Sequence, residues 1–198
     1  YDWGFGRQIL GETWRPQEGA GHYGRNHQFS TRMFVVPEQK HHPVVRGVKD
    51  MHTLAGAYSA VPIKGSVILG KNQVLDSMKP DGKPVENKPP SPSIWVREYQ
   101  SASGKKGRVF CSTQGASEDI ISEGVRRCII NGVFWCMGME EYIKSNMNVD
   151  FVGPYQPTPF SFGGEAQNVK PSDLAGWDSP IMPKGEKHKP KKTVKRRK

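Results

Sequence analysis

The sequence has little cysteine and lacks a long hydrophobic run. Its 198 residues include three cysteines, Cys111, Cys128 and Cys136, all on apolar positions. This odd number indicates small core residues rather than a disulfide framework, a metal set or a nucleophile. No stretch of about 18 apolar residues occurs, so the sequence predicts no membrane span. No initiator methionine or signal peptide is visible before Tyr1, and we expect a fragment of a longer gene product.

Basic residues outnumber acidic ones, and most of the excess lies at the C-terminal end of the given sequence. The net charge is +10, and residues 184–198 carry nine Lys or Arg and one acid, hence +8 of it. The other 183 residues carry only +2. Residues 184–198 are therefore predicted to be a disordered basic tail that attracts anions without sequence preference, and no specific nucleic-acid partner is expected.

The most informative segment is 107–138, which predicts a strand, a polar loop and a helix. Residues 108–112 form a short β-rich run, and 113–117 form a small-residue loop. An apolar face with helical spacing follows, made of Ile121, Val125, Cys128, Ile129, Gly132, Val133 and Cys136. Ser117 is a candidate N-cap and Gly138 a helix stop. The loop is either a simple cap or an anion or hydroxyl site, because the first N–H groups of a helix lack intrahelical partners.

The remaining chain predicts a mostly β structure with few helices. Apolar runs at 32–36, 67–69, 93–99 and 108–112 indicate strands, and another short run lies at 44–48. We expect about five strands and one long helix. A strongly apolar strand such as 108–112 normally needs helices on both faces of its sheet, so some helices are expected to be missing.

Several ordered motifs resemble the ThuA-like (trehalose-utilisation) family. They are GFGRQILGETW, GHYG at 21–24, HPVVRGV at 42–48, GRVFCSTQGASED, VFWCMG and NVDFVGPYQPTPFSFGGE. The resemblance covers roughly 4–181 and is to the C-terminal two-thirds of the family's domain, as found in long bacterial members. It implies an α/β fold, the flavodoxin-like, class I glutamine amidotransferase-like three-layer sandwich with a parallel-cored sheet, whose N-terminal strands would precede Tyr1. It also implies sugar catabolism, of trehalose or keto-glycosides, in a bacterial cytoplasm or periplasm.

The same resemblance argues against glutamine hydrolysis. Amidotransferases of this fold use a cysteine nucleophile at a strand-to-helix elbow and a later histidine. The loop 113–118, TQGASE, has no histidine, and Gly115-Ala116 departs from the Gly-His that many ThuA-like chains carry there. None of the three cysteines is placed as an exposed nucleophile.

The candidate site combines the Gly-rich loop 11–27 with the loop after strand 108–112. We expect His22 to act as general acid or base, with Glu12 orienting it or the substrate. Trp14 offers a face for a sugar ring, and Tyr23, Gln114 and Ser117 are predicted to bind the substrate. The resemblance places both loops at the same edge of the sheet, where α/β proteins bind ligands. The alternative is that His22 only packs within its loop.

A metal site is the less favoured interpretation of the histidines. His22, His27, His41, His42 and His52 crowd the first quarter of the chain. Their spacings do not match the tight ligand pairs of zinc sites, so no metal and no cofactor is expected.

The C-terminal part is predicted to have no regular structure. We divide the chain into an α/β domain at 1–146, an extension rich in Pro, Gly and aromatics at 147–183, and the tail at 184–198. The extension either packs on the domain or binds a carbohydrate or another domain of a longer polypeptide. Two functions stay open: an enzyme acting on sugars, and a catalytically silent α/β module that binds a glycan or a partner domain.

Overall fold

The computed structural model describes residues 4–23, 28–153, 155, 157, 168 and 170. The chain divides into two compact units, one with Tyr1–Val149 and Pro157–Phe160, the other with Asp150–Gln156 and Ser161–Lys198. The sheet, the helix and every candidate site residue belong to the first unit. The expected tail at 184–198, and most of the expected extension at 147–183, lie outside the described residues.

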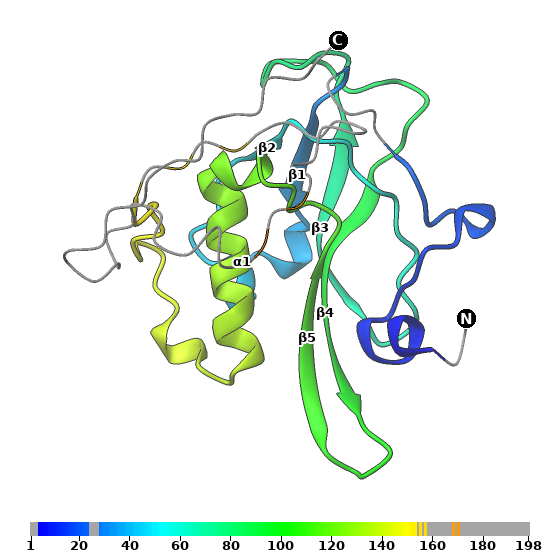
Figure 1. Ribbon diagram of the computed structural model, residues 1–198, viewed down its shortest axis with the longest axis vertical. Coiled ribbons are helices and arrows are strands. Elements are labelled where there is room, and N and C mark those ends of the chain that lie inside the picture. Colours follow the sequence, from blue (N-terminus) through cyan, green and yellow to red (C-terminus); the bar gives the residue numbers. More distant parts are fainter. Residues whose placement is uncertain are drawn as a thin grey trace. The chain divides into compact units, whose positions relative to one another are not determined.

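A five-stranded antiparallel sheet forms the centre of the first unit (Figure 1). Its strand order is β2-β1-β3-β4-β5. The strands are β1 Thr31–Val35, β2 Met51–Thr53, β3 Val67–Val74, β4 Ser91–Gln100 and β5 Lys106–Ser112. Four of them confirm the predicted strands at 32–36, 67–69, 93–99 and 108–112, each within a few residues at its start. β2, a three-residue strand, was not predicted.

The sheet corrects the expected architecture. The protein is a mixed α/β structure, but every strand pair of the described sheet is antiparallel, whereas the flavodoxin-like sandwich has a parallel core. The physical reason is clearest at β4 and β5, which only five residues join. A parallel connection needs a crossover of a dozen residues or more. A five-residue link therefore makes β4 and β5 antiparallel.

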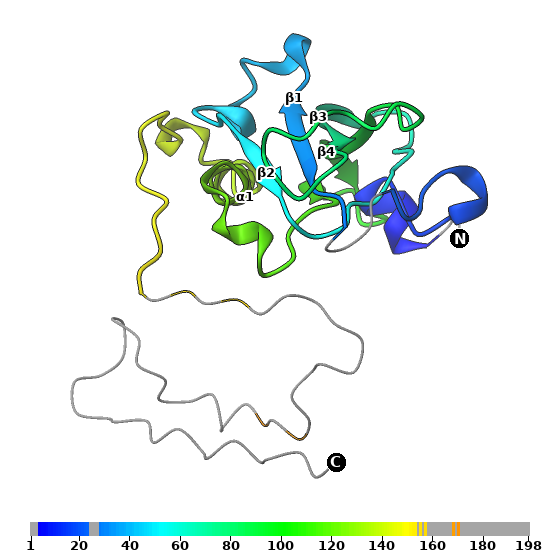
Figure 2. The same ribbon diagram turned by 90° about the horizontal axis from the view of Figure 1, so that it is seen from above.

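One α-helix, α1 (Glu123–Cys136), lies within the curve of the sheet (Figure 2). Two glycines eight residues apart bring it close to two different strands. Gly124 lies against the backbone of Asp50 just before β2, and Gly132 lies against the ring of Phe110 in β5. Since eight residues are just over two turns, both glycines face the sheet. The first turns of α1 therefore contact β2, and its later turns contact β5.

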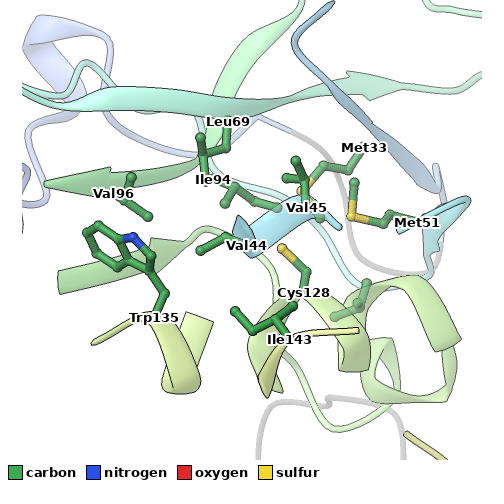
Figure 3. Packing of buried hydrophobic residues seen from close by; sticks show 11 residues of the cluster. Met33, Val44, Val45, Met51, Leu69, Ile94, Val96, Cys128, Trp135 and Ile143 are labelled. Atoms are coloured by element: carbon green, nitrogen blue, oxygen red, sulfur yellow. The ribbon is translucent and has the colours of Figure 1, made fainter. Parts of the chain in front are cut away.

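The main core fills the space between α1 and the sheet (Figure 3). Strands, helix and the turn Pro43–Val45 all contribute side chains: Met33, Val44, Val45, Met51, Leu69, Ile94, Val96, Val125, Cys128, Trp135 and Ile143. Asn131 of α1 donates from its amide to the carbonyls of Val44 and Arg46, both at 3.0 Å. The helix thus holds this turn by hydrogen bonds as well as by packing.

The N-terminal segment covers the opposite face of the sheet. A short π-helical segment, Gly6–Leu10, contacts β4 and β5. Trp95 of β4 points to this side and donates from Nε1 to the Leu10 carbonyl at 2.8 Å. The sheet is therefore covered on both faces, and α1 is the only α-helix among the residues that the structure describes. Short 3-10 turns complete the described structure: Pro16–Glu18, Pro37–Gln39, Pro43–Val45, Asp119–Ile121 and Glu140–Tyr142.

The helix differs from its prediction in where it begins and which face it buries. A 3-10 turn precedes it, and its N-cap residue is Ser122 instead of Ser117. Val125, Cys128 and Gly132 are buried as predicted, but Ile121 and Val133 are about half exposed. Gly138, with φ of +71°, follows the helix end as predicted. The close approach at Gly124, which the predicted apolar face did not contain, shifts the buried face toward this residue.

The hairpin of β4 and β5 extends beyond the rest of the sheet (Figure 1). Pairing of β3 with β4 ends at Val67 and Val96, whereas β4 and β5 stay paired as far as Gln100 and Lys106. Near its tip, the Tyr99 ring lies directly over Gly107. A side chain at 107 would have to displace this ring.

Candidate functional site

Three exposed rings, Trp14, His22 and Tyr58, form a cluster that we call the ring trio. The centroid of Trp14 lies 5.0 Å from that of His22 and 5.4 Å from that of Tyr58, with interplanar angles of 76° and 85°. His22 and Tyr58 lie 5.4 Å apart at 33°. Trp14 is 51% exposed and Tyr58 41%. The structure thus brings together two predicted site residues and adds a third.

Backbone pairing holds the ring trio in place. His22 and Tyr58 face each other across an isolated antiparallel bridge. Beside them, the Ser59 N–H donates to the Gly21 carbonyl at 2.8 Å, and the Gly21 N–H donates to Ser59 Oγ at 3.2 Å. A second bridge, Arg15 with Ala20, closes the turn that directly follows Trp14. The rings therefore stand on hydrogen-bonded backbone.

Tyr58 is the residue that the sequence interpretation missed. It lies in Ala55-Gly56-Ala57-Tyr58-Ser59-Ala60, a segment of small residues with no strand or helix periodicity. A large aromatic side chain alone among small residues has no neighbours in its own segment to pack against. That isolation is a signal that could have drawn attention to it.

Glu12, two residues before Trp14 in the sequence, lies in a cluster of ion pairs. Its Oε1 accepts from Arg7 Nη1 at 3.2 Å, from Arg15 Nη2 at 3.2 Å and from the Thr13 N–H at 2.9 Å. Its Oε2 accepts from the Val61 N–H at 2.5 Å. The carboxylate is 9% exposed. These contacts bind two cations and the backbone, whereas the predicted role was to orient His22 or the substrate.

Tyr23 belongs to the core instead of the exposed surface. It is 7% exposed and packs with Ala57 and Val74 in a second hydrophobic cluster. Its hydroxyl donates to the Pro89 carbonyl at 2.6 Å, and burial raises the pKa of this phenol. The ring therefore anchors the loop before β4, and its predicted contact with a substrate finds no support in this arrangement.

Gln114 lies in a buried polar network that joins three strands. Its Oε1 accepts from Ser93 Oγ at 2.5 Å, and its Nε2 donates to Asn72 Oδ1. Asn72 Nδ2 donates to Thr113 Oγ1 at 3.0 Å and to the Tyr58 carbonyl at 3.4 Å. Gln114 thus connects to the ring trio through Asn72. Because its own amide is buried and paired, its part in the site is structural in this arrangement.

The loop that carries Ser117 is fixed by a buried carboxylate. Asp119, 2% exposed, accepts from the Ala55, Gly115 and Ala116 N–H groups at 3.1 to 3.3 Å. Ser117 itself is exposed between these anchors. Its predicted contact with a sugar stays a prediction.

The cysteines and histidines give no sign of thiol or metal chemistry in the described part of the chain. Cys128 is buried, which raises its thiol pKa to about 12, and the half-buried Cys111 has a thiol pKa raised to about 11 for the same reason. Such thiols form little of the reactive thiolate near neutral pH. The described residues contain no group of three or more His, Cys, Asp or Glu side chains that could hold a metal ion. His27 lies outside them.

Within the same described ranges, no helix is both long and apolar enough to span a bilayer. Comparison with known proteins adds no assignment: no family model, no curated protein and no solved structure matches this chain. The site must therefore be interpreted from its own geometry.

Proposed function

We propose that this protein is a sugar-binding α/β module, with the ring trio as its binding surface. The observation that carries the proposal is the exposure of Trp14 and Tyr58, about half and two-fifths exposed, on a backbone fixed by hydrogen bonds. Large rings cost free energy when they face water, and rigid exposed aromatic side chains are a common feature of binding surfaces.

The ring spacing restricts how a ligand can bind. A group held between two rings needs about 7 Å between their centres, twice the ~3.5 Å contact distance. The centroids of the ring trio are only 5.0 to 5.4 Å apart. The rings therefore contact one another and leave no room for a cation cage, so a ligand lies on their outer faces. A pyranose, with an apolar C–H face and polar edges, suits such a surface.

The resemblance to ThuA-like proteins supports the choice of a sugar. That family is linked to trehalose and keto-glycoside utilisation, and the motifs GETW and GHYG, which carry part of the resemblance, contain Trp14 and His22. The antiparallel sheet differs from the fold that the resemblance implies. The proposal therefore depends on the ring trio first and on the resemblance second.

An enzyme acting on sugars is the second candidate, and the exposed imidazole of His22 favours it. A general acid or base must reach the bound ligand, and His22 lies in the ring trio where it can do so. The carboxylate predicted to assist it, Glu12, is paired with Arg7 and Arg15. Binding without turnover thus agrees better with the geometry.

The test is calorimetric titration of the full chain with trehalose and with a 3-keto-glucoside. We expect Trp14→Ala and Tyr58→Ala each to weaken binding about tenfold, which corresponds to roughly 1.4 kcal/mol for a lost ring contact. Phe34→Ala is the matched control, because Phe34 is also an exposed ring, 39% accessible, but belongs to β1.

Equal affinity of the Trp14→Ala, Tyr58→Ala and wild-type proteins would refute the proposal. Turnover of either sugar that His22→Ala abolishes would favour the enzyme instead. If neither sugar binds while a partner domain does so through the same rings, the module binds protein and the sugar assignment is wrong.

A further inference from the structure

The carboxylate of Glu12 connects the two segments that carry Trp14 and Tyr58 of the ring trio. One segment is its own loop, where Trp14 lies between Thr13 and Arg15, both of which donate to Glu12 Oε1. The other contains Tyr58 and ends at Val61, whose N–H donates to Oε2. A single side chain therefore spans the distance between two loops that are 49 residues apart in the sequence.

The surroundings of this carboxylate suit a fixed link. Glu12 and Arg15 are each 9% exposed, and Arg7 is 15% exposed. Charged hydrogen bonds that are shielded from water are stronger and better directed than exposed ones. Arg7 also donates from Nη1 to the Val61 carbonyl at 3.3 Å. The Val61 backbone is thus held on both its N–H and its C=O side.

We propose that Glu12 is a positioning residue that sets the placement of Trp14 relative to Tyr58. This inference rests on the proposed sugar-binding function and gives Glu12 a role other than acid or base catalysis. The carboxylate acts through the two loops: Oε1 fixes the Trp14 loop and Oε2 fixes the Tyr58 loop. Binding is tighter when the ring trio is pre-formed, because the ligand then does not have to order it.

The chain offers a matched control in Glu18. Both Glu12 and Glu18 pair with Arg15, but the Glu18 side chain is 63% exposed and its partner is Arg15 Nη1, within its own loop. Glu18→Gln removes one charge next to the same arginine. It leaves the bond between Glu12 and Val61 in place.

The experiment compares Glu12→Gln with Glu18→Gln in two measurements. Trehalose affinity is measured by calorimetry, and the Trp14 indole and Val61 amide signals are followed by NMR, with Trp14→Phe identifying the indole signal. Glutamine has nearly the shape of glutamate but only one acceptor oxygen. We expect Glu12→Gln to weaken binding about tenfold and to move both signals. We expect Glu18→Gln to change affinity less than about twofold and to leave both signals in place.

A second variant removes the same bond from the other side. Val61→Pro has no N–H to donate, yet it keeps the ion pairs of Glu12 with Arg7 and Arg15, so it tests the link if Glu12→Gln does not fold. It should move the Trp14 indole signal as Glu12→Gln does. A Trp14 signal that stays unchanged in both variants, or sugar affinity equal to wild type in both, would overturn the positioning role.

The outcomes also separate this inference from the proposed function. If wild-type protein binds no trehalose, the sugar assignment fails. The Trp14 signal still decides the positioning role, because it depends only on the link between the two loops.

Discussion

Replacing Gly124 with alanine is the sharpest test of how α1 packs on the sheet. In most helices this change stabilises, because alanine is the better helix former by about 1 kcal/mol. Here a Cβ at position 124 would overlap the carbonyl oxygen of Asp50 and lie 2.9 Å from Met51 Cγ. Since the obstacle is backbone joined to β2, it cannot rotate away as a side chain would.

The expected size follows from two opposing terms. Inserting a methyl group into a tightly packed site costs about 1–3 kcal/mol, and a backbone obstacle places this site at the upper end. Subtracting the helix gain of about 1 kcal/mol leaves a net loss of about 2 kcal/mol in the free energy of unfolding. For a domain of this size that corresponds to a decrease of about 4–8 °C in Tm.

Urea unfolding followed by circular dichroism measures the loss, with Val133→Ala as control on the exposed side of α1. The control should change stability by less than about 0.5 kcal/mol, since Val133 is about half exposed. Gly132→Ala should fall between the two, because its obstacle is the Phe110 ring, 2.6 Å from the new Cβ, which can tilt. A Gly124→Ala protein more stable than wild type would refute the close packing of α1 on β2.

Two further predictions concern the half-buried His42 and the buried Gln114. Burial lowers the pKa of His42, whose Nδ1 accepts the Val44 N–H, so its neutral form is favoured in the folded state. Stability from this group is present above the unfolded pKa of about 6.5 and lost as pH falls below it. The free energy of unfolding in urea should decrease less between pH 7.5 and pH 5.0 for His42→Gln than for wild type. The variant of the exposed neighbour, His41→Gln, should show the same decrease as wild type. Gln114→Ala should lower the free energy of unfolding by about 1–3 kcal/mol, because it leaves Asn72 Oδ1 buried without its donor. Thermal unfolding matching wild type would contradict that prediction.

The local structure was largely predictable, and its arrangement in space was less so. Short apolar runs located β4 and β5, and helical spacing located α1, because both patterns follow from burial. The antiparallel pairing of β4 and β5 could also have been derived, since the turn at 101–105 is too short for a crossover. The resemblance to a parallel fold took precedence over this local signal.

The rotation of α1 was not predictable from apolar residues alone. Gly124 makes the closest approach to the strands, and the predicted apolar face did not include this glycine. The position of the strands decides which helix face is buried. That position is set by residues distant in sequence, such as Asp50.

The candidate site shows the same division. Trp14 and His22 were selected from one glycine-rich loop, and the structure brings their rings together. The roles of Glu12, Tyr23 and Gln114 depend on partners at Val61, Pro89 and Asn72, 42 to 66 residues away in the chain. Residue type indicates what chemistry a side chain can do, and only its partners decide whether that side chain is available for a ligand.

The long hairpin offers a practical opening for engineering. Its last residues pair only with each other, so peptide inserted between Ser101 and Gly104 would lengthen the ribbon without entering the core. An epitope or a fluorescent label could be grafted there. The grafted chain would then report on ligand capture while the rings and the helix keep their native surroundings.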